Sequence, residues 1–481
     1  MKRPPSFLEA LVTLSITFSV ILIGIVFLKV DAHIPLFIGT LICIGFAFYL
    51  RFPWSDIEKG IFDGIKSALL PMLLIMFIGL VISGWIASGT VPYLIYWGLK
   101  LLSPTWFLTS AVLICCVMSM SIGSSWTTIG TLGVALMGVG SGLGVPAAIT
   151  AGAIATGAFF GDKQSPLSDT TNFAPAVSGA TLYEHIRSML YTTLPTLVIA
   201  LAIYTFLGFK YSSGAFDRTG MDLIITTIEK SYRLTPFLLI PLVVLIIMIL
   251  KKVPALLAMM TAAVLGLIFT MVFQNGSLAV SLKVLHYGFV SQTGVETVDK
   301  LLSRGGLHSM MWTISLVFIA LSLAGVLQKT GTLTVVLEKI AGFVKNAFGL
   351  ITTTIWSTAI MNFLTGEVFM PMLLSARVFL PAFDRQKLHR KVLSRSIEDG
   401  GTIIAPMVPW GMCGVFTAVT LGVPTLEYVP YYFLGLLNPF VSMGIAAIGF
   451  GVFRADQSST DSINESSDDT GMEAENKALS C

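Results

Sequence analysis

The chain has 481 residues and a net charge of +3, with 55% hydrophobic residues, 11% charged residues and a mean hydropathy of +0.85. Soluble domains carry roughly 25% charged residues, so the composition excludes an ordinary soluble protein and indicates one that is embedded in a lipid bilayer. The five cysteines form no CxxC pair, which indicates neither a disulfide framework nor a zinc site. HExxH, GxSxG and glycine-rich phosphate-loop motifs are also missing from the sequence, so we expect no enzyme, no cofactor and no nucleic-acid partner.

Apolar segments long enough to cross about 30 Å of hydrocarbon recur along most of the chain. The first is too long for a signal-peptide core and lacks a small-residue cleavage site, so we interpret it as a retained anchor helix. The pattern predicts an all-α polytopic membrane protein with about eleven or twelve transmembrane helices. The clearest segments are residues 7–28, 34–50, 69–86, 234–250, 253–273 and 310–327.

Two parts of the chain align with each other at an offset of 243 residues. This offset places Gly123 on Gly366 and Gly179 on Gly422, and a shared period is the usual mark of a duplication. We therefore expect five parts: N-terminal transmembrane helices (1–55), a first repeat (56–235), connecting helices (236–300), a second repeat (301–453) and a disordered acidic tail (454–481).

Loop charges predict that the two repeats have opposite orientations in the membrane. Residues 384–395 hold five Lys or Arg residues, whereas the aligned residues 141–152 hold no charge. Short cytoplasmic loops carry an excess of Lys and Arg, so the basic loop and the N-terminus, with Lys2 and Arg3, are expected in the cytoplasm. Equivalent loops on opposite sides are typical of inverted-repeat transporters with broken or re-entrant helices. The alternative is that the loop charges differ for unrelated reasons.

Residues 161–179, GDKQSPLSDTTNFAPAVSG, form a polar segment between two apolar ones. A polar backbone at membrane depth is tolerated only where it is buried in protein or lines a water-filled cavity. Pro166 and Pro175 are expected to prevent a continuous helix here. The preceding helix, residues 147–158, consists mostly of Ala, Gly and Thr, which allows close helix packing.

This polar segment could hold a cation. A hard cation such as Na+ prefers oxygen ligands, and protonation and Na+ binding compete at a buried carboxylate. The alternative is a surface turn in which Ser168 caps the next helix and Lys163 neutralises Asp162. The candidate ligands are Asp162, Ser168, Asp169, Thr170, Thr171 and Asn172.

Further acids extend this candidate site. Glu367 aligns with Ser124, so the two positions are expected to face one cavity, with Glu367 as an ion ligand and Ser124 in gating or proton relay. Glu398 and Asp399 are candidates for gating or proton relay as well. Their alternative role is in salt bridges to Arg395 or Lys391 at the membrane edge.

A polar cluster just after the segment has a simpler interpretation. Glu184 stands three residues after Thr181, as in a helix capping box. His185 and Arg187 are expected at the membrane interface.

The segment GDKQSPLSDTTNFAPAVSG and the following TLYEHIRSMLYTT resemble the signature region of NhaC-type Na+/H+ antiporters, as do the TGE and EDGGT stretches. The resemblance extends over residues 11–453. It implies secondary transport of Na+ and H+ in the bacterial inner membrane, within a superfamily of inverted repeats with re-entrant hairpins. It also implies motif roles for residues 162 and 169–172, with Glu367 and Glu398 as second-repeat companions.

Two transporter functions are favoured from the sequence, and a channel is a further alternative that would not explain titratable acids in broken segments of both halves. The first is Na+/H+ exchange by alternating access, and the second is cation-coupled exchange of small organic acids or amino acids, for example malate against lactate. An anionic substrate would require a basic group or helix N-termini, and Lys163, Arg187 and Arg377 are the candidates for the basic group. A homodimer is also left open.

Overall fold

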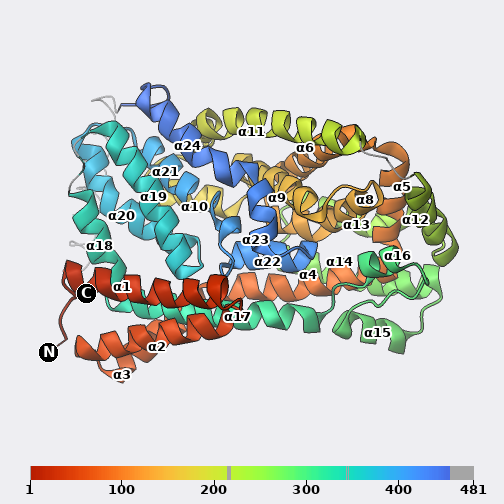
Figure 1. Ribbon diagram of the computed structural model, residues 1–481, viewed down its shortest axis with the longest axis horizontal. Coiled ribbons are helices and arrows are strands. Elements are labelled where there is room, and N and C mark those ends of the chain that lie inside the picture. The colour runs from red at the N-terminus through yellow and green to blue at the C-terminus, as the bar shows by residue number, and fades with distance from the viewer. Residues whose placement is uncertain (1, 214–217, 343, 345, 455–481) are drawn as a thin grey trace, which may run out of the picture.

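The computed structural model describes residues 2–213, 218–342, 344 and 346–454. Within these residues every named element is a helix, and β pairing is limited to an isolated bridge between Leu388 and Arg454. Most of the long helices run along the long axis of the molecule (Figure 1). The all-α prediction is therefore confirmed, while the predicted acidic tail lies outside the described residues apart from Arg454.

Eight helices of the described chain are long and apolar enough to cross a membrane, and two bent helix pairs raise the number to at most ten. The chain is thus a multi-pass membrane protein. The expected count of about eleven or twelve is too high by this criterion, because polar and proline-containing breaks divide some apolar runs into shorter helices. The eight helices are Phe7–Phe27, Leu69–Ala87, Pro104–Ile122, Leu182–Tyr211, Ala255–Gln274, Leu307–Lys329, Ala347–Thr365 and Arg390–Leu421.

The N-terminal helices pack against a helix from the second half of the chain. The first begins at a capping box, in which Ser6 and Glu9 each accept the other's backbone N–H. Helices α2 and α3 then pack on α17, with which α3 makes backbone contact at Gly64. The bounds are α1 (Phe7–Leu22) with a π-helical turn Ile23–Phe27, α2 (His33–Tyr49) and α3 (Trp54–Ser67).

The first half contains the α9–α10 pair that holds the polar segment. Its elements are α4 (Leu69–Ala87), α5 (Thr90–Leu101), α6 (Pro104–Ile122), α7 (Ser125–Thr128), a π-helical turn Ile129–Gly133, α8 (Val134–Gly142), α9 (Ala147–Gln164), α10 (Asp169–Ser178) and α11 (Leu182–Ser213). The connecting elements are α12 (Arg218–Ser231), a 3-10 turn Pro236–Leu239, α13 (Ile240–Leu250), α14 (Ala255–Gln274), α15 (Leu278–Tyr287) and α16 (Glu296–Leu302).

The second half repeats this order of long and short helices. Its elements are α17 (Leu307–Lys329), α18 (Thr332–Ala341), α19 (Ala347–Thr365), α20 (Phe369–Arg385), α21 (Arg390–Gly400), a 3-10 turn Ala405–Met407, α22 (Met412–Leu421), α23 (Thr425–Tyr428), a 3-10 turn Val429–Tyr431 and α24 (Phe433–Ala447).

Glycines that align in the sequence end equivalent helices. Gly123 and Gly366 have φ of 74° and 67°, and each ends a 19-residue helix, α6 or α19. Gly179 and Gly422, with φ of 73° and 69°, end the 10-residue helices α10 and α22. A left-handed residue at this position closes a helix with little strain only when it is glycine. The alignment of the two halves therefore pairs residues with the same local structure.

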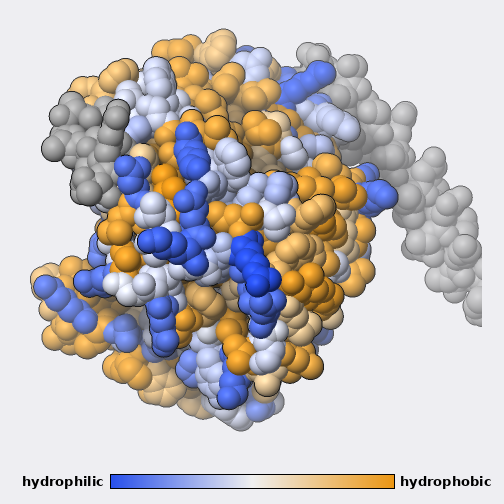
Figure 2. All heavy atoms as spheres, turned by 90° about the vertical axis from the view of Figure 1, so that its right-hand side faces the viewer, coloured by the Kyte–Doolittle hydropathy of each residue, from blue (hydrophilic) through white to orange (hydrophobic). Residues whose placement is uncertain are grey.

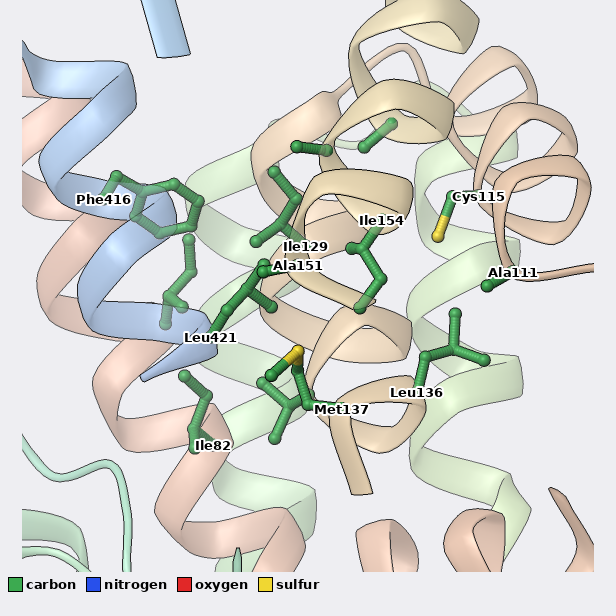
Figure 3. Close-up of a cluster of buried hydrophobic side chains, with 14 of the residues drawn as sticks. Ile82, Ala111, Cys115, Ile129, Leu136, Met137, Ala151, Ile154, Phe416 and Leu421 are labelled. Atoms are coloured by element: carbon green, nitrogen blue, oxygen red, sulfur yellow. The ribbon is translucent and has the colours of Figure 1, made fainter. Parts of the chain in front are cut away.

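Helix α9 packs closely against α6 because its side chains are small. A Cβ added at Gly157 or Gly161 would collide with the backbone of α6, at the carbonyl oxygens of Val112 and Cys116 respectively. Figure 3 shows how Ala151 and Ile154 of α9 lie among apolar side chains from α6, α8 and α22. The close packing expected for this helix is therefore present.

One end of the molecule has a polar centre with an apolar rim (Figure 2). Figure 2 views the end of the molecule that holds α5, α12 and α16, where hydrophilic side chains gather in the middle and hydrophobic ones surround them. This pattern is typical of a protein whose helix ends meet water while its flanks meet lipid. In Figure 1, α8 lies toward this end and α20 toward the opposite one.

The polar segment at residues 161–179 is more helical than expected. Helix α9 continues through Lys163, so only residues 165–168 are non-helical before α10 begins. Pro166 lies in this gap, but Pro175 lies inside α10 and does not break it. The prediction that both prolines interrupt the helix was wrong for Pro175, since a helix packed among other helices tolerates the loss of one backbone hydrogen bond.

Candidate functional site

A cavity of about 90 Å³ lies at the break between α9 and α10. The first residues of four helices, α7, α10, α20 and α22, reach it together with the last turn of α9. Helix N-termini carry partial positive charge, so this arrangement favours carboxylates at the cavity wall. The lining residues are Pro71, Leu74, Ser124, Ser125, Trp126, Phe159, Asp162, Lys163, Asp169, Thr170, Val368, Phe369, Thr402, Met412 and Cys413.

Lys163 lies between two carboxylates. Its Nζ is 2.8 Å from Asp162 Oδ2 and 3.0 Å from Glu398 Oε1, and it also donates a hydrogen bond to the Thr170 hydroxyl. None of the three charged side chains is more than 6% exposed. A buried ammonium needs such partners because an isolated charge is costly to remove from water. The surface-turn alternative also paired Lys163 with Asp162. The structure contains this ion pair, but it lies inside the protein and not at the surface.

Glu398 connects the second half of the chain to this cluster. Its Oε1 also accepts a hydrogen bond of 2.6 Å from the Thr402 hydroxyl, while its buried Oε2 has no hydrogen-bond partner among the described residues. The alternative that Glu398 pairs with Arg395 or Lys391 at the membrane edge is wrong, because its ion pair is with Lys163. The ion pair joins α21 to α9.

Asp169 is exposed and lines the cavity at the start of α10. Its Oδ1 accepts the backbone N–H of Thr170 at 2.8 Å, and no ion pair to Asp169 occurs among the described residues. The cluster therefore brings three carboxylates together with one ammonium group. This surplus of negative charge, next to hydroxyl groups, is suited to a cation.

Three of the predicted ligands support the break in the helix and do not line the cavity. Ser168 caps α10 by accepting the N–H of Thr171 at 3.4 Å. Thr171 donates a hydrogen bond of 3.0 Å to the carbonyl oxygen of Asp162. Asn172 donates to the carbonyl oxygens of Pro166 and Ser168 at 2.9 and 2.6 Å. These side chains hold Asp162 and the start of α10 in place.

Glu367 and Ser124 both begin helices beside the cavity. Glu367 accepts the backbone N–H groups of Phe369 and Met370 at 2.9 and 2.7 Å, which caps α20. Ser124 caps α7 by accepting the N–H of Thr127 at 3.2 Å, and it lines the cavity. Glu367 itself is buried outside the lining, although the next two residues belong to it.

Asp399 belongs to a separate buried cluster between α11, α21 and α24. Its Oδ1 accepts hydrogen bonds from Asn438 at 2.7 Å and Thr192 at 3.2 Å. Arg395 is also fully buried, and it donates long hydrogen bonds to Ser188. The described ion pairs do not include one between Arg395 and Asp399. Asp399 thus lies behind the cavity, where it is not part of the wall.

The residues after the segment differ partly from expectation. Thr181 and Glu184 form the predicted capping box. Arg187 and Arg377 are exposed, but His185 is fully buried, with its Nδ1 2.7 Å from the Ser394 hydroxyl. His185 therefore packs inside the protein against α21 and does not face lipid or bulk water.

The sequence also missed part of the cavity wall. Thr402, Trp126, Met412 and Cys413 line it, yet apolar and thiol side chains give no signal that separates them from ordinary membrane-helix residues. Thr402 could have been found, because four-residue spacing from Glu398 would place it on the same face of a helix, and the Thr402 hydroxyl does bond to Glu398 although α21 ends at Gly400.

Comparison with known proteins decides the family. The Na+/H+ antiporter family matches residues 157–450. The Na+/H+ antiporter NhaC of Alkalihalophilus pseudofirmus is 38% identical over 92% of this chain and 96% of its own, and NhaC of Bacillus subtilis is 37% identical over 88% and 93%. The arginine/ornithine antiporter ArcD of Halobacterium salinarum is 37% identical over 95% and 94%.

The chain belongs to the Na+/H+ antiporter family. The resemblance to NhaC-type proteins is therefore confirmed. The region that matches the family contains the acids described above, namely Asp162, Asp169, Glu367, Glu398 and Asp399.

Proposed function

We propose that this protein exchanges Na+ for H+ across the bacterial inner membrane by alternating access. The observation that carries this proposal is the buried cluster in which Lys163 pairs with both Asp162 and Glu398 while Asp169 faces the same cavity without an ion pair among the described residues. A site with more carboxylates than ammonium groups has excess negative charge, which a bound positive ion would neutralise. Either Na+ or a proton supplies that charge.

The binding site that we propose consists of Asp169 and Asp162 with hydroxyl oxygens at the cavity wall. Thr170 and Ser124 line the same space, and such oxygens are the ligands that hard cations prefer. A carboxyl group that has taken up a proton is a poor Na+ ligand, so the two ions exclude each other. In the empty site, Lys163 forms ion pairs with both Asp162 and Glu398. When Na+ binds to Asp162, Lys163 remains paired with Glu398.

We further propose that the two halves form an inverted repeat, with the N-terminus and the basic loop in the cytoplasm. The matched glycine caps support a duplication, and the opposite positions of α8 and α20 in Figure 1 fit a reversed orientation. Apart from the transported Na+ and H+, the proposed mechanism uses no cofactor.

The test is Na+-dependent proton movement in inverted membrane vesicles, followed with a pH-sensitive dye. Asp169→Asn removes the carboxylate that faces the cavity, so we expect exchange to be abolished while the protein still inserts. The matched control is Asp63→Asn, which changes an exposed acid on α3 and should leave exchange unchanged. Retained exchange in Asp169→Asn would contradict the proposed role of Asp169 and direct attention to Asp162.

The same assay separates this proposal from organic-solute exchange, which the name of the arginine/ornithine relative brings into consideration. Of the three basic candidates for an anionic group, Arg187 and Arg377 are exposed away from the cavity wall, and Lys163 already pairs with two acids. We therefore expect proton flux with Na+ alone. Flux that requires added arginine, malate or lactate would overturn the proposal.

A further inference from the structure

His185 is a buried titratable residue that the proposed exchange site does not use. It lies in the first turn of α11 and is completely buried. Its Nδ1 is 2.7 Å from the Ser394 hydroxyl, while its Nε2 has no hydrogen-bond partner among the described residues. A buried polar atom without a partner is rare and requires an explanation such as an ordered water.

Buried polar atoms without a described partner are concentrated on the helix of His185 and on three others. Seven of the eleven buried side-chain nitrogen and oxygen atoms without a described partner belong to α9, α11, α21 and α24. One of them is Oε2 of Glu398, which lies one helical turn after Ser394, the hydrogen-bond partner of His185, on the same face of α21. Buried water typically bonds to two to four such groups. This grouping fits ordered water between the imidazole and the Glu398 carboxylate.

The charged groups that act on His185 come from two neighbouring helices. Glu398 and Arg395 belong to α21, and Lys163 belongs to α9. His185 therefore lies near the Lys163–Glu398 ion pair, and it is not one of the residues that line the cavity with Asp169.

His185 is also close to a polar surface. The preceding residue, Glu184, lies 3.4 Å from His389 Nε2 at the start of α21, beside the basic loop. Ser394, the partner of His185, lies between this end of α21 and Glu398, so His185 packs nearer to the basic-loop end than Glu398 does. Imidazole is suited to such a step because it has two ring nitrogens, one of which can accept a proton while the other donates one.

We infer that His185 is the proton relay between the basic-loop face and the Lys163–Glu398 pair, acting through ordered water at Nε2. A proton from bulk water binds to the imidazole, and the imidazole passes it through that water to the Glu398 carboxylate. The proton taken up at one face is the proton released at the other, so no other reactant is needed. This inference rests on the proposed Na+/H+ exchange, whose Na+ site does not include His185.

The experiment compares two modes of transport in the same vesicles. Na+/H+ exchange needs the relay, whereas exchange of external 22Na+ for internal Na+ moves no proton. His185→Asn can keep the bond to Ser394, because its amide lies where Nδ1 does, but it cannot carry a proton. We expect this variant to lose Na+/H+ exchange and to keep 22Na+/Na+ exchange. His286→Gln, which changes an exposed histidine, is the control and should keep both.

Two results would overturn the inference alone. One is retained Na+/H+ exchange in His185→Asn, and the other is loss of both modes in a correctly inserted variant, which would make His185 part of the Na+ site or of the structure. Wild-type protein without Na+/H+ exchange would instead overturn the proposed function and this inference with it.

A second variant covers the case in which His185→Asn does not insert. Ser394→Ala removes the hydroxyl that fixes Nδ1, so we expect the pH of half-maximal Na+/H+ exchange to shift while 22Na+/Na+ exchange stays unchanged. An unaltered pH profile in Ser394→Ala would contradict the relay.

Discussion

At the scale of single residues, Lys163 organises the site. Its ammonium group is shared between Asp162, one residue earlier in the chain, and Glu398, from the other half. An ion pair buried this deeply contributes little net stability by itself, but removing one partner leaves an uncompensated charge. The effect of removing Lys163 therefore depends on whether another cation can neutralise Asp162 and Glu398 in its place.

Lys163→Gln should destabilise the protein, and Na+ should partly restore its stability. The change leaves Asp162 and Glu398 without their shared partner, and breaking a buried pair in this way costs about 3–5 kcal/mol. We expect a lower Tm than for the wild type, and a larger rise of Tm on adding Na+. Lys59→Gln, an exposed lysine on α3, is the control. An unchanged Tm in Lys163→Gln would show that the ion pair does not stabilise the fold.

The loop that Asp299 stabilises lies outside the membrane helices, and its stability should depend on pH. The pKa of Asp299 lies below its usual value, chiefly because the carboxylate accepts the backbone N–H of Thr293 at 2.7 Å and secondly the hydroxyl of Ser291. Because the folded pKa is depressed, the stabilisation is present above the unfolded value, about 3.9, and is lost as pH falls through the folded pKa. Hydrogen exchange at Thr293 and Gly294 should therefore accelerate in acid.

The substitution Asp299→Asn should produce the same acceleration at neutral pH. Glu296→Gln, on the same short helix, is the matched control, since the carboxylate of Glu296 is 80% exposed. Equal protection of the loop amides in Asp299→Asn and in the wild type would contradict this account.

At the scale of helices, the contact between α6 and α9 sets the position of Asp162. Gly161→Ala would place a methyl group against the backbone of α6 at Cys116 and Met120, and inserting a group into such packing costs about 1–3 kcal/mol. We expect a lower Tm and weaker Na+ exchange. The control is Gly45→Ala on α2, where an added Cβ meets nothing within 4 Å. Wild-type Tm in Gly161→Ala would mean that the contact is looser than described.

The helices also show what sequence can and cannot predict. The thin helix before the polar segment, the break at Pro166 and the glycine caps follow from residue types, because small residues, proline and left-handed glycine act locally. The pairing of Lys163 with Glu398 and the burial of His185 depend on how distant helices meet. Local sequence patterns do not encode either feature. The sequence therefore indicated which segment belongs to the candidate site, but not the contacts that its side chains make with distant helices.

At the scale of the whole molecule, the proposed inverted repeat leads to a labelling prediction. Ser141 and Arg385 are exposed positions in the two aligned loops, and the four described cysteines are buried. With Cys481 replaced by serine, a membrane-impermeant maleimide should label Ser141→Cys only from outside the cell and Arg385→Cys only from inside. Labelling of both positions from one side would contradict the inversion.

The charge balance of the site, three carboxylates against one ammonium group, also affects how tightly the proposed movements of Na+ and H+ are coupled. A vacant site would carry surplus negative charge into the low-dielectric part of its path, which is costly, whereas a site holding Na+ or a proton carries less. In the proposed mechanism an empty site would therefore change sides slowly, and this electrostatic cost would limit the leakage of Na+ that is not exchanged for a proton.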